Sequence, residues 1–304
     1  MHTPIAMIFQ SRFIRSVLLS EICKKYENFF VRNVCYPLPV NFSKEGITLS
    51  FFTLKTVALL SMLWDHVTYV WPLALTLEVL FFPDVSESIP ALLVLQRATD
   101  YLGRIAAPIF LFSIANGYRH TRNFNKYALR LLVFACLAEY PYYLLFGFHG
   151  NIMFTLLLGL LTLRLMDWGN GKRTGLGYVL AVGLVILAHH FRLTEGGGRY
   201  ILFILAFYLT EQWPVRKKVL LWLVLMPLFR YGLIWEFFAE QLFTYPWFHM
   251  LCINAVGPLL GVAFTFFYNG KKGPAFPGDK YLWYVFYPAH LLLLGLAQRA
   301  MLGV

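Results

Sequence analysis

The stretch FFTLKTVALLSMLWDHVTYVWPL, residues 51–73, decides the fold of this chain. Its apolar run is long enough to cross a lipid bilayer, which takes about 20 residues in a helix. Eight more apolar segments follow at residues 101–118, 127–147, 152–167, 175–190, 199–213, 218–235, 247–268 and 281–299. We therefore predict an all-α, polytopic integral membrane protein with about nine transmembrane helices, within a range of about eight to ten.

The composition supports this class and argues against a soluble protein. Of the 304 residues, 59% are hydrophobic and 13% are charged, whereas soluble domains contain about 25% charged residues. The net charge of +11 comes largely from short connections, as the positive-inside rule and contact with anionic lipid headgroups require. We expect membrane lipids, and no nucleic acid, among the partners. The four cysteines form no CxxC pair and show no zinc spacing, so no metal site is expected.

The charges of the connections predict an orientation. With nine spans, the basic connections and the N-terminus share one side, which receives 20 of the 26 Lys and Arg residues, against 6 on the other. Acidic or neutral connections, such as residues 76–100, face the opposite side. The basic side should be cytoplasmic and the C-terminus outside.

Residues 1–45 precede the first span as a separate basic segment. Ile5, Phe9, Phe13 and Val17 recur at helical spacing in this segment, which is typical of a helix that lies on the inner membrane surface. A disordered or misassigned extension is the alternative. Residues 46–304 are expected to form the transmembrane domain.

Ionisable and polar side chains fall inside several predicted spans. Such groups are costly in a membrane and usually face the protein interior or a water-filled cavity. Scattered singly, each would need its own partner, so one shared polar cavity explains them better. The candidates are Asp65, His66, Arg104, Glu139 and His290, with Asn116 and Asn254 as polar companions.

Each candidate has a functional and a structural interpretation. His66 can act as a general base, or it can join two helices through a hydrogen bond. Asp65 points about 100° away from it on a helix, so one of the two should face the cavity while the other contacts a neighbour such as Arg104. Arg104 can stabilise a developing charge or hold an anion, or it can pair with Asp65 or Glu139. We favour pairing with Arg104 for Glu139 and a supporting role for His290.

A basic loop lies on the predicted cytoplasmic face. It reads RHTRNFNK, residues 119–126, and continues to Arg130. These cations can bind the phosphates of a nucleotide-like donor such as coenzyme A, or they can serve the orientation of the chain alone. The candidates are Arg119, Arg122, Lys126 and Arg130. No Walker, GxGxxG, GxSxG or HExxH motif accompanies them.

A set of motifs resembles, in order, the TraX family, which is known from conjugative plasmids. The motifs are LKTVALLSMLWDH (54–66), GRIAAPIF (103–110), NGYRHTRNFNKYALRL (116–131), AEYPY (138–142), NIMFTLLLG (151–159), FYNG (267–270) and KYLWYVFYPAHLLL (280–293). The resemblance covers residues 52–299. It departs from the family pattern at Asn116, where members often carry an acidic residue, and at EGGGR (195–199), where a tyrosine–glycine turn is usual.

The resemblance implies an activity. The founding member of the family is associated with N-terminal acetylation of the F-type pilin subunit. The family is similar to wider transmembrane acyltransferases, including the acyltransferase-3 enzymes and the lysosomal heparan glucosaminide acetyltransferase. By this likeness, cytoplasmic acetyl-CoA would be the co-substrate, a bacterial inner membrane the location, and His66 the base, with Arg104 in the active-site shell. The acceptor would be the N-terminal amine of a pilin-like peptide or a hydroxyl of a cell-surface glycan.

We therefore expect a membrane-embedded acetyltransferase in which His66 deprotonates the acceptor. Asp65 or Glu139 would orient that base, and Arg104 would stabilise the oxyanion or hold the donor. An acetyl-histidine relay is a variant. Two other classes stay open: a transporter whose midplane polar residues coordinate its substrate, and a non-catalytic assembly protein for a surface appendage. The oligomeric state is also open, a homodimer included.

Overall fold

The regular structure of this protein is helical. The computed structural model describes residues 48–73, 76–77, 81, 90–169, 174–191, 193–230 and 247–303. The helices are α2 (Phe51–Val70), α4 (Pro90–Gly103), α5 (Ala106–His120), α6 (Phe124–Phe146), α7 (Ile152–Gly169), α8 (Thr174–His190), α9 (Gly197–Leu209), α10 (Val215–Arg230), α12 (Trp247–Phe266) and α13 (Asp279–Leu302). Outside these helices, the described ranges contain one isolated β-bridge, between Leu49 and Tyr268. The predicted all-α class is confirmed.

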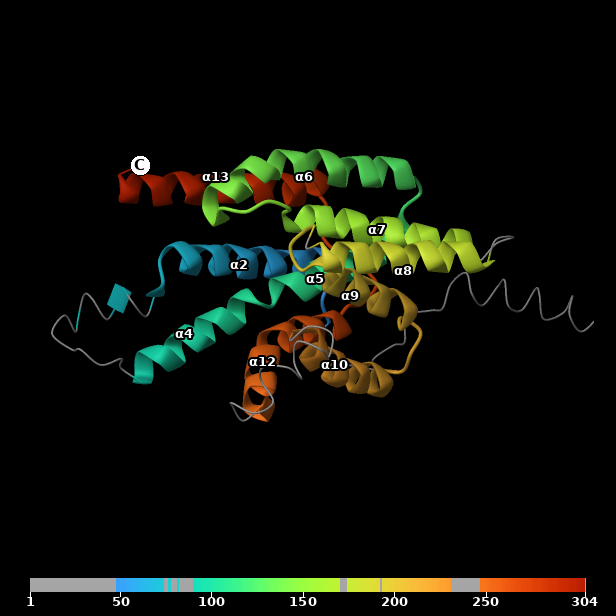
Figure 1. Cartoon of the computed structure of the whole chain (residues 1–304), viewed down its shortest axis with the longest axis horizontal. Helices are drawn as coiled ribbons and strands as arrows, with labels where there is room; N and C mark the ends of the chain where they lie inside the picture. The colour runs from blue at the N-terminus through green and yellow to red at the C-terminus, as the bar shows by residue number, and fades with distance from the viewer. Residues whose placement is uncertain are drawn as a thin grey trace, which may run out of the picture. The chain divides into compact units, whose positions relative to one another are not determined.

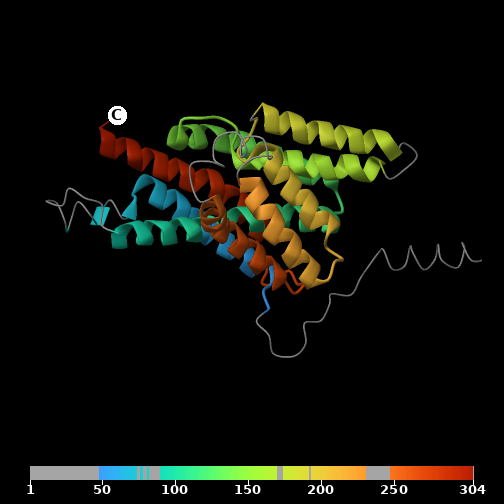
Figure 2. The same ribbon diagram turned by 60° about the horizontal axis from the view of Figure 1, so that its bottom comes forward.

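The described helices belong to one compact unit, Ile47–Val304. Helix α5 is central to it and packs against α2, α7, α9 and α12. Helix α6 lies beside α13, α7 lies beside α8, and α10 packs against α12 (Figures 1 and 2). A site on α5 is therefore enclosed by helices from the early, middle and late parts of the chain. The predicted surface helix in residues 1–45 lies outside the described residues.

Local sequence explains where several helices begin and end. Ser50 caps the start of α2, because its hydroxyl accepts a hydrogen bond from the N–H of Thr53 at 3.1 Å. The side chain of Asn123 caps α6 in the same way, through the N–H of Lys126 at 2.9 Å. Gly147 ends α6 with φ 74°, a left-handed conformation that glycine adopts without strain. The turns around α6 therefore fall close to the predicted bounds of that span.

One helix is absent from the sequence prediction. The sequence predicts a connection at residues 76–100, but α4 occupies Pro90–Gly103, and the chain leaves helical geometry at Arg104 before α5 begins. Helix α4 mixes charged with apolar residues, so an average over its hydropathy does not reveal it. The predicted span 101–118 consists of the end of α4, the break and most of α5.

Two described helices are each long and apolar enough to cross a membrane: α6 and the Tyr281–Leu302 part of α13. Shorter apolar helices cover Gly175–His190, Gly197–Leu209 and Ala255–Phe266. A helix lies in each of the predicted apolar segments, yet the number of helices that cross the bilayer stays a prediction.

Large apolar side chains cover the outward faces of several helices. Soluble proteins rarely leave contiguous apolar surface open to water, and lipid tails can cover such a surface. The exposed residues include Leu129, Leu132, Val133 and Leu137 on α6, Val179, Val182, Ile186 and Leu187 on α8, Leu220, Leu223 and Val224 on α10, and Leu293 and Leu296 on α13. Together with the two long apolar helices, this surface indicates a membrane protein.

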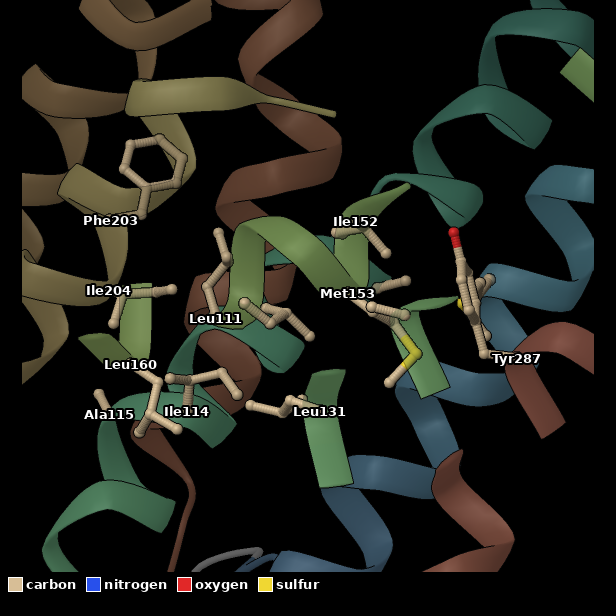
Figure 3. Close-up of a cluster of buried hydrophobic side chains, with 14 of the residues drawn as sticks. Leu111, Ile114, Ala115, Leu131, Ile152, Met153, Leu160, Phe203, Ile204 and Tyr287 are labelled. Atoms are coloured by element: carbon tan, nitrogen blue, oxygen red, sulfur yellow. The ribbon is translucent and has the colours of Figure 1, made fainter. Parts of the chain in front are cut away.

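The largest buried cluster forms where α5, α6, α7, α9 and α13 meet. Figure 3 shows part of it, with side chains that interdigitate and leave little exposed surface, such as Leu111, Leu131 and Leu160. Ile152, Met153 and Tyr287 lie together at one side of the same view. The core therefore extends to the start of α7 and the middle of α13.

Two glycines test how closely α8 and α9 approach. A Cβ added to Gly198 on α9 would meet the carbonyl oxygen of Val185 on α8 well inside van der Waals contact, whereas a Cβ on Gly183 would meet no atom within 4 Å. Gly198→Ala should lower the unfolding temperature in detergent by several degrees, because overpacking costs about 1–3 kcal/mol. Gly183→Ala, the matched control, should hold or raise that temperature, because alanine is the better helix former. Equal behaviour of the two variants in a thermal melt would contradict this packing.

Candidate functional site

Two cavities with different chemistry lie within the helical unit. The first has a volume of about 230 Å³ and carries both signs of charge beside a histidine; its lining includes Asp65, His66, Arg104, Glu195 and Arg199. We call it the histidine cavity. The second has a volume of about 400 Å³ and carries cations among aromatic rings; its lining includes Lys55, His120, Arg130, Lys272 and Trp283. We call it the basic cavity.

The two cavities follow one another along α2 and α5. On α2, Lys55 borders the basic cavity and His66 borders the histidine cavity, roughly 16 Å further along the helix. On α5 the order is reversed, with Pro108 at the histidine cavity and Gly117 at the basic cavity. Between these ends, both cavities are bordered by the same four side chains, which we call the shared wall: Met62, Phe110, Ile152 and Tyr287.

Hydrogen bonds to α13 fix the protonation of His66. His290 Nδ1 lies 2.7 Å from the carbonyl oxygen of Phe286, which can only accept, so His290 Nδ1 carries the hydrogen. Neutral His290 then has a bare Nε2, which lies 2.7 Å from His66 Nδ1. His66 must donate from Nδ1, which leaves its Nε2 lone pair available. The two ring planes differ by 5° and the ring centres lie 5.0 Å apart, which suits the hydrogen bond between the ring nitrogens.

The helix-joining hydrogen bond expected for His66 is therefore present, and its partner is His290. The sequence predicts that Asp65 or Glu139 orients His66, and this prediction is wrong, because the described contacts give that position to His290. An adjacent residue such as Asp65 leaves the helix on another face. A residue 224 positions away supplies the partner instead.

Asp65 contacts Arg104, as predicted. Asp65 Oδ1 lies 3.9 Å from Arg104 Nε, near the outer limit of an ion pair. Gly103 permits this approach, because a Cβ at that position would overlap the Asp65 carboxylate. Arg104 stands at the break between α4 and α5 and keeps 51% of its side-chain surface exposed. Arg104 therefore borders the cavity, and its long ion pair with Asp65 leaves the guanidinium able to bind another group.

Glu139 has a different neighbourhood from the predicted one. The sequence favours an ion pair with Arg104, but the Glu139 carboxylate instead accepts hydrogen bonds from the turn that precedes α7. Its donors are the His149 ring at 3.1 Å, the N–H of Gly150 at 2.9 Å and the side-chain amide of Asn151 at 2.7 Å. Three neighbouring donors that point the same way attract the carboxylate more effectively than one distant cation. Glu139 therefore anchors the start of α7.

Glu195 is a cavity residue that the sequence analysis missed. It lies in the connection between α8 and α9 and borders the histidine cavity. Burial raises the pKa of Glu195 to about 7, against opposing contributions from the Tyr142 hydroxyl and the Arg104 charge. The glycine run that follows it is the sequence signal that was available, because such a run brings backbone and neighbouring side chains close to other helices.

The basic cavity contains cations that the sequence analysis did not single out. The Lys55 ammonium lies 4.5 Å from the centre of the Phe51 ring and 5.4 Å from that of Trp283. Lys272 pairs with Asp279 at 2.8 Å. Arg130, which the sequence did predict, has a buried Nε with no hydrogen-bond partner in the described part of the chain. An anion could therefore gain a charge-assisted hydrogen bond there.

The other predicted donor-binding cations do not border the basic cavity. Arg119 pairs with Glu211, donates to the carbonyl oxygen of Tyr208 and stacks on the Tyr208 ring. Arg122 and Lys126 lie exposed at the turn between α5 and α6. Of the predicted set, Arg130 alone contributes to the described lining of that cavity.

The structure describes the side chain of one of the two predicted polar companions, Asn116, and not that of the other, Asn254. Asn116 is buried, lies 3.5 Å from the Tyr268 hydroxyl and accepts from the His120 ring through its backbone oxygen at 2.8 Å. It borders neither described cavity. The side chain of Asn254 lies outside the described residues.

The arrangement combines three chemical elements. A neutral imidazole with one available nitrogen is a proton acceptor, and a guanidinium nearby can stabilise negative charge. A neighbouring cation-lined cavity can hold an anionic molecule. Because both cavities meet at one wall, a ligand in the basic cavity could present its end to His66.

Two comparisons with known proteins match this chain. A family model described as "TraX protein" matches residues 50–298. A curated protein of Dichelobacter nodosus, "Probable fimbrial assembly protein FimC, serogroup H1", is 30% identical over 264 residues, which are 82% of this chain and 96% of that protein. No solved structure matches the chain significantly.

Glu195 should give the protein a measurable pH dependence. An acid whose pKa is higher in the folded than in the unfolded state binds protons more tightly when folded, so stability falls as pH rises. Stability is lost between pH 4.5, the ordinary pKa of a glutamate, and about pH 7, the pKa in the folded protein. The loss in the free energy of unfolding corresponds to roughly 3 kcal/mol at most. Between pH 5 and pH 8, the unfolding temperature of the wild type should fall more than that of Glu195→Gln. Identical slopes in the two melts would show that Glu195 titrates normally.

Proposed function

The chain belongs to the TraX family, and from this membership and the two cavities we propose that it is a membrane-embedded acetyltransferase. It would move an acetyl group from acetyl-CoA to an amine or hydroxyl acceptor. The observation that carries the proposal is the bare Nε2 of His66, held in one tautomer by His290 at 2.7 Å. A structural histidine between helices would need no cavity in front of it, and His66 borders one.

The basic cavity is the place where the donor fits. Its volume of about 400 Å³ is within the usual range for drug-sized ligands, so it would take the pantetheine arm of acetyl-CoA rather than the whole coenzyme. Lys55 and Arg130 supply positive charge along that cavity, and the unpartnered Arg130 Nε is a ready donor. The nucleotide end would lie outside, where Arg122 and Lys126 are exposed.

The proposed reaction is acyl transfer through a tetrahedral intermediate. The acceptor nitrogen or oxygen attacks the thioester carbonyl carbon while His66 Nε2 takes the proton that the acceptor loses. Arg104 stabilises the negative charge that develops on the carbonyl oxygen. The intermediate then collapses, the carbon–sulfur bond breaks, and the departing thiolate receives the proton from His66. The imidazole returns to its neutral state.

Supporting residues act by position in this proposal. His290 keeps the reactive nitrogen of His66 unprotonated, and Asp65 holds Arg104 at the break between α4 and α5. Glu139 anchors the turn before α7 and would not take part in proton transfer. The catalytic roles that the resemblance implies for His66 and Arg104 are kept, and the one expected for Glu139 is replaced.

The acceptor and the orientation follow from the same proposal. A pilin-like peptide that offers its N-terminal amine is favoured, since the Dichelobacter nodosus relative is named a probable fimbrial assembly protein. A cell-surface glycan hydroxyl is the other acceptor of suitable chemistry. The basic cavity would face the cytoplasm of a bacterial inner membrane, with nine spans, the N-terminus inside and the C-terminus outside.

The name of that relative also favours a second candidate. A fimbrial assembly protein can act by binding subunits, without chemistry at His66. The acetyltransferase needs His66 Nε2 as a base, whereas an assembly protein that only binds subunits does not. A variant of His66 therefore separates the two candidates.

His66→Ala tests the proposed base. In detergent, the wild-type protein with radiolabelled acetyl-CoA and a pilin-like peptide should transfer label, and His66→Ala should lose about a hundredfold or more of the rate, the usual contribution of a positioned base. His190→Ala removes an exposed histidine at the end of α8 and is the matched control. If His66→Ala labels the acceptor at the wild-type rate, His66 is not the general base. Absence of transfer by the wild type, with fimbrial assembly intact in His66→Ala cells, would favour the second candidate.

Arg130→Ala tests the donor site. Loss of a charge-assisted hydrogen bond worth about 1.5–3 kcal/mol should raise the KM for acetyl-CoA by about tenfold or more and leave kcat little changed. Lys217→Ala removes an exposed cation at the start of α10, away from both cavities, and should leave KM as it is. Equal KM values for wild type and Arg130→Ala would place the donor elsewhere.

A further inference from the structure

The shared wall contains one polar group. Met62, Phe110 and Ile152 are apolar, whereas Tyr287 carries a hydroxyl and retains only 4% exposure. That hydroxyl has no hydrogen-bond partner of normal geometry in the described part of the chain. Buried hydroxyls in proteins are nearly always paired. An exception at the meeting point of two cavities calls for a ligand that supplies the missing acceptor.

The start of α7 lies beside the same two cavities. Asn151 accepts hydrogen bonds from the N–H groups of Met153 and Phe154, through its side-chain and backbone oxygens. Ile152, the first residue of the helix, borders both cavities together with Tyr287. The first N–H groups of a helix lack partners within it, and they favour negative charge.

Tyr287 and the start of α7 lie close to the proposed base. The Tyr287 and His290 ring centres are 5.8 Å apart, and His290 bonds directly to His66. Figure 3 shows Ile152 beside Tyr287, with Met153 next to them. The Glu139 anchor described above fixes the turn from which Ile152 starts. Tyr287 and Ile152 are thus held by elements that also position the histidine.

We infer that the Tyr287 hydroxyl, beside the start of α7, binds the carbonyl oxygen of the acyl group at the junction of the two cavities. This inference rests on the proposed function. A thioester that reaches the junction from the basic cavity places its carbonyl oxygen at this hydroxyl. As the acceptor attacks, the electron pair of the carbonyl bond moves onto that oxygen, and the hydrogen bond from Tyr287 strengthens. The start of α7 favours the negative charge that develops there. Arg104 then contributes its charge from the histidine-cavity side.

Tyr287→Phe isolates the hydroxyl, because the ring that builds the wall is kept. The rate of acetyl transfer should fall about a hundredfold, the usual effect of losing one donor to an oxyanion, while KM for acetyl-CoA changes little. The unfolding temperature should not fall, because the lost hydroxyl has no normal hydrogen bond to lose. Tyr140→Phe, which removes an exposed hydroxyl on α6, is the matched control.

Binding measurements separate this inference from the proposed function. A trifluoromethyl ketone analogue of acetyl-CoA forms a tetrahedral hydrate and should bind the wild type more tightly than coenzyme A does. Tyr287→Phe should lose about tenfold or more of the affinity for the ketone and keep that for coenzyme A. Equal ketone affinity and equal transfer rates in wild type and Tyr287→Phe would overturn the inference and leave the acetyltransferase standing. A wild type that binds neither ligand and transfers no label would overturn both.

Discussion

The hydrogen-bond relay from Phe286 through His290 to His66 is the interaction on which the site depends. A carbonyl oxygen can only accept, so the direction of every proton in the relay is set at its first member. The relay also joins α2 to α13, helices from opposite ends of the described sequence. It therefore serves packing and chemistry together: the same bond that satisfies a polar group among apolar helices leaves one nitrogen bare.

The cost of burying polar groups also explains the anchoring of α7. Glu139 is placed among apolar residues of α6, and the turn before α7 offers it several donors. Once the turn is fixed, Asn151 takes up the next N–H groups of the helix, and the first residue, Ile152, borders both cavities. A carboxylate with no part in the proposed reaction thus determines where the start of α7 stands.

Much of the fold could be predicted from the sequence, and less of the site. Apolar length predicted a helix in each segment, because burial and backbone hydrogen bonding act locally. The contact between Asp65 and Arg104 was predictable because one buried charge needs its opposite. The role of His290 was only partly predictable, since the pairing depends on how α2 and α13 rotate against one another. Glu195 and Lys55 were missed, because a connection and a span end reveal no facing until the helices pack.

The shared wall has a consequence for the ion gradients across the membrane. A continuous aqueous pore through an energised membrane would let protons and sodium ions run down their gradients. None of the four side chains of the wall is charged, so a small ion meets a dielectric barrier there even when both cavities are filled with water. The flat, neutral acetyl group of the proposed reaction carries no such penalty. Electrical insulation and chemical delivery are thus compatible in one narrow layer of the protein.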